Sequence, residues 1–128
     1  MMSLLDRLFL KKEPVRHLEM PSWDESVTHM QGKELSFFTD TIVRVIVSND
    51  HAKRLIILRS DHGYYKAIYE EIHVWDEDEW LYCSSDPNRY PAYWEQVDSS
   101  INGKSFYGTE DEAIHAVSES HEYKMYFI

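Results

Sequence analysis

The spacing of apolar positions changes along the chain, and the first stretch is helical in character. Between residues 3 and 12 apolar side chains recur every three or four positions and predict a short amphipathic helix; they are Leu4, Leu5, Leu8 and Phe9. Pro14 disfavours helix at the residue before it. Pro21 precedes either an irregular link or a second helix that begins near Ser22. We therefore interpret residues 1–34 as a helical or irregular N-terminal segment.

From residue 41 the pattern predicts strands. The runs 41–48 and 54–59 are dense in β-branched or apolar residues at successive positions, with a turn at residues 49–51 between them. A strand that is apolar on both faces needs cover above and below, so we expect these two strands to pair antiparallel in the interior of a sheet. A third strand is expected over residues 64–75, with a bulge or bend at Glu70–Glu71, where the pattern breaks.

The rest of the chain mixes strand and helix signals. Residues 76–79 are expected to turn into a further strand at 80–83, and residues 90–97 fit either an edge strand or a short helix. Thr109 and Glu112 have the spacing of a capping box, which predicts a helix over residues 110–118. Residues 122–128 are expected to return as a terminal strand.

These elements together predict one domain of the α+β class that spans residues 1–128. Its expected centre is an antiparallel meander of about five or six strands. A short N-terminal helix and the C-terminal helix at about 110–118 would pack on this sheet.

Charge and cysteine content restrict the partners and the compartment. The chain has 13 basic and 23 acidic residues and a formal net charge of −10, so it would repel a phosphate backbone and we expect no nucleic-acid partner. Cys83 is the only cysteine, which precludes an internal disulfide and favours a reducing cytoplasm. Asp6 and Arg7 interrupt the first apolar run, unlike the core of a signal peptide, and no later run is long enough to span a bilayer.

Aromatic residues are concentrated between residues 64 and 94, where Tyr and Trp fill nine of 31 positions on either side of the acidic run 76–79. Aromatic side chains offer a large contact area with few rotatable bonds, and acidic side chains set the sign of the local field. We expect about half of the larger rings to be buried and the others to form a protein-binding surface inside an acidic rim. The predicted partner-binding residues are Glu71, Trp75, Asp76, Glu77, Asp78, Glu79, Trp80, Tyr93 and Trp94.

Catalytic and metal sites receive weaker support. If the hairpins turn near His51 and His62, His73 would lie about opposite His51, and Asp50 and Asp76 could complete a transition-metal site. A register slip of one residue would separate these side chains, so we predict no bound metal. Cys83 has no histidine near it in sequence and is predicted to be a small buried side chain. The isolated glycines form no phosphate-binding loop, and no cofactor is expected.

The small, acidic, aromatic-rich chain resembles the broad class of bacterial immunity proteins, which inhibit polymorphic toxins by occupying their basic active sites. This resemblance is one of composition and class, and it implies a non-enzymatic module that binds a protein partner with a basic surface. One alternative is a metal-dependent or cysteine enzyme. Another is a membrane-surface accessory protein held by residues 1–12, because residues 1–17 carry four basic and two acidic side chains. Packing of that apolar stripe on the core is the interpretation we prefer.

Overall fold

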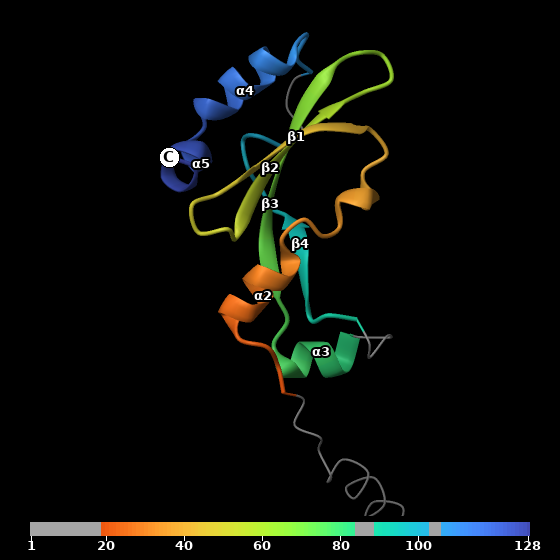
Figure 1. Ribbon diagram of the computed structural model, residues 1–128, viewed down its shortest axis with the longest axis vertical. Helices are drawn as coiled ribbons and strands as arrows, with labels where there is room; N and C mark the ends of the chain where they lie inside the picture. Colours follow the sequence, from red (N-terminus) through yellow and green to blue (C-terminus); the bar gives the residue numbers. More distant parts are fainter. Residues whose placement is uncertain (1–18, 84–88, 103–105) are drawn as a thin grey trace, which may run out of the picture.

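The computed structural model describes residues 19–83, 89–102 and 106–128. At its centre is a four-stranded antiparallel sheet with the strand order β1–β2–β3–β4. The strands are β1 (Thr41–Val47), β2 (Lys53–Arg59), β3 (Tyr65–Val74) and β4 (Ala92–Gln96). The helices are α2 (Trp23–Met30), the 3-10 helix η1 (Leu35–Phe37), α3 (Glu77–Cys83), α4 (Glu110–Ser118) and α5 (His121–Tyr126). Figure 1 shows α4 and α5 beside the upper part of the sheet, α2 beside its lower part and α3 below it.

The first two strands pair antiparallel as predicted, but of these two strands only β2 is an inner strand. Residues 55–58 of β2 are buried, whereas Val45 and Val47 of β1 are 36% and 39% exposed. The prediction of two inner strands is therefore wrong for β1, because its β-branched residues favour strand geometry without requiring cover on both faces. The bulge also lies in β1, between Ile42 and Arg44, while the pairing of β3 at Glu70–Glu71 is continuous on both sides.

Two segments that were predicted as strands are helices. The Asp76 carboxylate accepts a hydrogen bond from the backbone N–H of Glu79 at 2.7 Å, and the acidic first turn of α3 suits the positive end of the helix dipole. Ser120 caps α5 in the same way by accepting from the N–H of Tyr123 at 3.2 Å. These local caps outweigh the strand preference of the neighbouring aromatic residues. The described sheet consequently has four strands and not five or six.

Other local predictions agree with the structure. Residues 90–97 contain an edge strand, β4, and a helix begins after Ser22, whose hydroxyl accepts from the N–H of Glu25 at 3.1 Å. The helix over 110–118 is confirmed, with Thr109 Oγ1 accepting from the N–H of Glu112 at 3.1 Å. The Glu112 carboxylate returns to the N–H of Gly108, one residue before the expected partner. The helix predicted over residues 3–12 lies outside the described residues.

Both faces of the sheet carry apolar side chains. On one face, which we call the α4 face, strand residues pack against α4 and α5; the buried members are Leu55, Ile57, Ala67, Tyr69, Ile101, Ala113 and Val117. On the opposite face, the α2 face, Ile72, Ala92 and Trp94 pack with Met30 of α2. Along β3, the apolar contacts of α4 and α5 extend to Tyr69. On the α4 face, side chains of β3 and β4 beyond Tyr69 are therefore able to meet solvent.

A buried ion pair crosses the α2 face. Arg54 Nε of β2 lies 2.7 Å from Glu70 Oε1 of β3, and the two side chains are only 2% and 9% exposed. Arg54 Nη1 also donates to the carbonyl oxygen of Lys33 at 2.7 Å, and the guanidinium lies 4.2 Å from the ring centroid of Trp94. Burial raises the pKa of Glu70, and the hydrogen bond from Arg54 opposes this rise.

Trp94 connects this ion pair to the end of α2. Its Nε1 donates to the carbonyl oxygen of Met30 at 2.7 Å, and its backbone N–H donates to Glu34 Oε2 at 2.9 Å. Glu34 adopts a left-handed backbone conformation with φ 62°, which is unfavourable for a residue with a side chain. The contact with Trp94 helps to hold that conformation, so α2 and the following loop are fastened to β2, β3 and β4 through one network.

We expect Glu70→Leu to lower the free energy of unfolding by about 3–5 kcal/mol, because it leaves the Arg54 charge buried without its partner. The double variant Arg54→Met/Glu70→Leu should lose less stability than Glu70→Leu alone, since no buried charge remains. Urea unfolding followed by tryptophan fluorescence measures both. As a control, Lys66→Met removes a partly exposed ion pair with Asp40, at 3.3 Å, and should cost about 0–1 kcal/mol. A double variant less stable than Glu70→Leu would contradict this account of the buried pair.

Candidate functional site

The predicted partner-binding residues gather where β3 leads into α3. In the β3–β4 pairing, Glu71 lies opposite Glu95 and His73 lies opposite Tyr93. Alternation along the strands places these four side chains on the α4 face, beyond the apolar contacts of α4 and α5. The N–H of Trp75 donates to the carbonyl oxygen of Pro91 at 3.0 Å, which continues the β3–β4 hydrogen bonding as far as Trp75.

Three rings form the centre of this surface. The ring centroids of His73 and Trp75 are 5.5 Å apart, those of His73 and Tyr93 5.1 Å, and those of Trp75 and Tyr93 5.4 Å. All three side chains are partly exposed. The buried ring of Trp80 lies 6.3 Å from that of Trp75 and supports it from the interior. We call the surface made by the three rings and their acidic neighbours the aromatic–acidic patch; its residues are Glu71, His73, Trp75, Asp76, Glu79, Tyr93 and Glu95.

Carboxylates stand on both sides of the His73 ring. Glu79 Oε2 lies 3.8 Å from His73 Nε2, and Glu95 Oε2 lies 3.5 Å from His73 Nδ1. Burial raises the pKa of Tyr93, and the negative charges of Glu95 and Glu79 add to this rise. A hydrogen bond from the backbone N–H of Glu79 lowers the pKa of Asp76. The patch therefore presents a negative field around aromatic rings at neutral pH.

The structure divides the predicted binding residues into two groups. Those that are at least partly exposed lie at the β3–α3 junction, on α3 or on β4; they are Glu71, Trp75, Asp76, Glu77, Asp78, Glu79 and Tyr93. Trp80 and Trp94 are only 7% and 5% exposed and belong to the interior. Trp94 serves the buried network of the α2 face, on the side of β4 away from the patch.

Two members of the patch, His73 and Glu95, were not among the predicted binding residues. The sequence signal that groups them is the alternation of Glu71, His73 and Trp75 along one strand and of Tyr93 and Glu95 along the next. This signal becomes usable only once residues 92–96 are assigned as a strand that pairs with β3. The exposed side chains of Leu81 and Tyr82 on α3 were also missed; they are 53% and 90% exposed.

The histidine pair considered for a metal site consists of His51, in the turn before β2, and His73 of β3. The β2–β3 pairing ends at Lys53 and Glu71, the N–H of Ile72 still donates to the carbonyl oxygen of Ala52 at 2.9 Å, and His51 itself has a left-handed φ of 62°. The proposed third ligand, Asp50, instead accepts hydrogen bonds within its own turn. In residues 19–83, 89–102 and 106–128, no three His, Cys, Asp or Glu side chains are grouped in a way that could hold a metal ion. Cys83 ends α3, and its side chain lies outside the described part of the structure.

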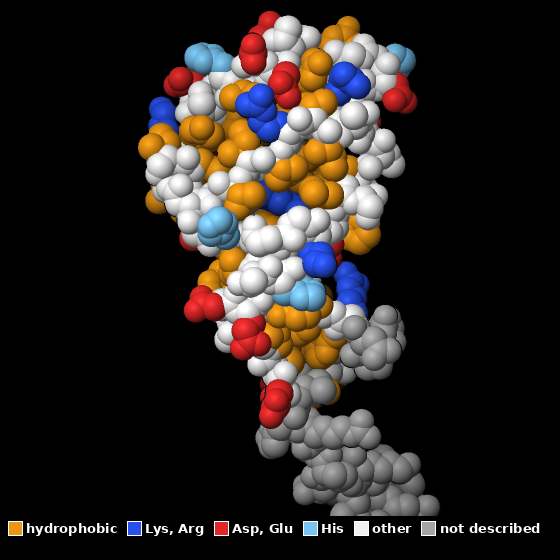
Figure 2. Space-filling view, viewed as in Figure 1, with side chains coloured by type: hydrophobic (Ala, Val, Ile, Leu, Met, Phe, Trp, Pro, Cys, Tyr) orange, Lys and Arg blue, Asp and Glu red, His pale blue; other side chains and the backbone are white. Residues whose placement is uncertain are grey.

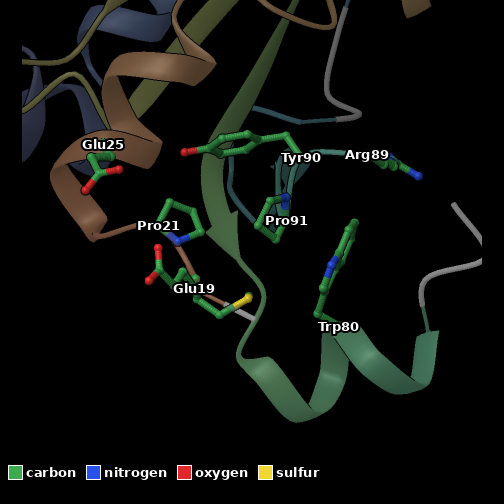
Figure 3. Close-up of a pocket in the computed structure, with 8 residues that line it drawn as sticks. Glu19, Pro21, Glu25, Trp80, Arg89, Tyr90 and Pro91 are labelled. Atoms are coloured by element: carbon green, nitrogen blue, oxygen red, sulfur yellow. The ribbon is translucent and has the colours of Figure 1, made fainter. Parts of the chain in front are cut away.

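A hollow of 420 Å³ lies on the other side of Trp80, between α2, α3 and the start of β4. Figure 3 shows Pro21, Trp80, Tyr90 and Pro91 around it, with Glu19 and Glu25 on one side and Arg89 pointing away. The Tyr90 ring stacks on His29 of α2 at a centroid distance of 3.6 Å. Figure 2 shows hydrophobic side chains at the surface of this lower region, between acidic side chains on one side and basic side chains on the other. The walls of the hollow combine apolar and aromatic side chains with three charged ones, and these lining residues include no nucleophile paired with a base.

Comparisons of the chain with protein-family models, with curated proteins and with solved structures found no match. No partner, ligand or activity is therefore carried over to this chain from a relative. Among the helices that the structure describes, none has the length and apolar character needed to cross a membrane.

The geometry of the patch depends on the start of α3, and this dependence can be measured. Asp76→Ala should lower the urea midpoint of unfolding, because it removes the oxygen that accepts from the N–H of Glu79. Asp76→Asn keeps an oxygen at the same place but removes the charge at the helix N-terminus, so its midpoint should fall less than that of Asp76→Ala. Urea unfolding of the two variants makes the comparison. Equal stability of both would show that Asp76 does not act as a cap.

Proposed function

We propose that the protein is a non-enzymatic binding module whose aromatic–acidic patch docks on a basic surface of a protein partner. The observation that carries this proposal is the cluster of His73, Trp75 and Tyr93, with ring centroids 5.1–5.5 Å apart, set between the carboxylates of Glu79 and Glu95. Partly exposed rings of this kind supply contact area at a small cost in side-chain entropy. Carboxylates around them select a partner of opposite charge.

The exposure of the carboxylates favours binding over catalysis. The side chains of Glu79 and Glu95 are 45% and 43% exposed, so water screens their charges. A general acid or base gains most of its effect in a site that excludes water, where its pKa and its position are fixed. An exposed carboxylate can still guide the approach of a basic partner, because this steering acts before the surfaces touch.

In its most specific form, the proposal is an immunity-type inhibitor. The partner would be a cytoplasmic enzyme that has a basic active site, such as one that binds a nucleic-acid or phosphate substrate. The net charge of −10 would draw the protein to that site, and the rings would then cover it and exclude the substrate. Blockade of this kind requires no chemistry from the inhibitor.

The charges and the rings should affect binding separately. Replacing the four acids 76–79 by Asn and Gln should lower the association rate about tenfold at low salt and reduce its salt dependence. Trp75→Leu and Tyr93→Leu should instead raise the dissociation rate, because ring contacts form only in the docked complex. The partner is isolated by pull-down from the source cell, and both rates are then measured by surface-based kinetics.

The chain provides a matched control for charge. Four acidic side chains on or next to α4, Glu110, Asp111, Glu112 and Glu119, can be neutralised in the same way. Thermal unfolding of every variant verifies that it is folded at the temperature of the kinetic experiment. If the patch variants weaken binding no more than the α4 variant does, the patch is ordinary solvated surface and the proposal is wrong.

A further inference from the structure

We infer that the aromatic–acidic patch recognises arginine side chains of its partner in preference to lysine side chains. This inference rests on the proposed function, since it names the group on the basic partner that the patch binds. It follows from three features of the described residues: the close packing of the rings, the two carboxylates beside them, and a buried contact of the same kind elsewhere in the molecule.

The rings are packed too closely to enclose a cation. Centroid distances of 5.1–5.5 Å bring His73, Trp75 and Tyr93 into contact with one another, so no space for an ammonium group remains among them. A cation must approach the outer faces of Trp75 and Tyr93. A planar guanidinium can stack on a single ring face, whereas a compact ammonium gains most when several rings surround it.

The carboxylates add a second criterion. Glu79 and Glu95 each direct one oxygen toward His73, at 3.8 and 3.5 Å, and their exposed side chains can accept further hydrogen bonds. The five N–H donors of a guanidinium lie in one plane and can reach a carboxylate while that plane rests on a ring. The ammonium of lysine is a point charge and cannot offer a flat face and a donor fork together.

The interior of the same protein contains the arrangement that we propose for its surface. Arg54 lies 4.2 Å from the ring centroid of Trp94 and donates to the carboxylate of Glu70 at 2.7 Å. Lys53 shows what a lysine does in a comparable position: its Nζ lies 4.3 Å from the centroid of Tyr126 and 2.9 Å from Asp50 Oδ2. A lysine can therefore bind beside a ring and a carboxylate, but its ammonium group has no flat face that stacks on the ring. We expect a preference for arginine and not an exclusion of lysine.

Short synthetic peptides test this inference with the full-length protein. The peptides are identical except that every basic position is arginine, lysine or the neutral analogue citrulline, and fluorescence anisotropy of a labelled peptide gives the Kd. The arginine peptide should bind about threefold or more tightly than the lysine peptide, and the citrulline peptide should bind weakest. Trp75→Leu and Tyr93→Leu should reduce the ratio of the two Kd values toward one. The α4 charge variant should leave the ratio unchanged.

The possible failures are distinct. Equal Kd values for the arginine and lysine peptides, both raised by neutralising the acids 76–79, would overturn arginine recognition and leave the proposed function in place. An arginine preference that survives both leucine variants would also overturn the inference, because the preference would arise elsewhere on the protein. If the arginine peptide does not bind at about 1 mM, arginine recognition is overturned as well. The kinetics measured with the captured partner would then still decide the proposed function.

Discussion

Keeping the charge of Arg54 in the interior is the constraint on which the described structure depends most. A buried guanidinium is costly unless it is paired: here Glu70 accepts from Nε, the carbonyl oxygen of Lys33 accepts from Nη1 and the ring of Trp94 lies against the group, while Nη2 has no hydrogen-bond partner among the described residues. These partners come from three separate segments of the chain. The contacts of this one charge therefore fix how β2, β3, β4 and the end of α2 meet. The hydrogen bond from the backbone N–H of Trp94 to the Glu34 carboxylate secures the outer edge of β4.

The same strand that completes this network also builds the patch. Successive residues of β4 point to opposite faces, so Trp94 enters the interior of the α2 face while Tyr93 and Glu95 emerge on the α4 face. The β3–β4 register then places Tyr93 beside His73 and Glu95 beside Glu71. A buried interaction on one side of the sheet thus sets the spacing of rings and carboxylates on the other. In this account the patch is preorganised, because its groups lie on paired strands and on a capped helix.

The sequence predicted those parts of the fold whose signals are local. The β-branched runs of β1 and β2 and the Thr109 cap of α4 are examples, because the residues that decide them are neighbours in the chain. Residues 80–83 and 122–128 were predicted as strands because their aromatic side chains favour strands, but Asp76 and Ser120 cap helices there. The patch was found in part from composition. His73 and Glu95 required the strand register, and the burial of Trp80 and Trp94 required contacts between distant segments.

The central claim is that the partner binds where β3, β4 and the start of α3 meet. Chemical-shift mapping of backbone amides, during addition of the captured partner to labelled protein, tests it most directly. The account predicts that the largest changes fall within residues 71–79 and 93–95, on one continuous surface. Changes centred on α4 and α5, or on the hollow between Tyr90 and Trp80, with residues 71–79 unaffected, would contradict it.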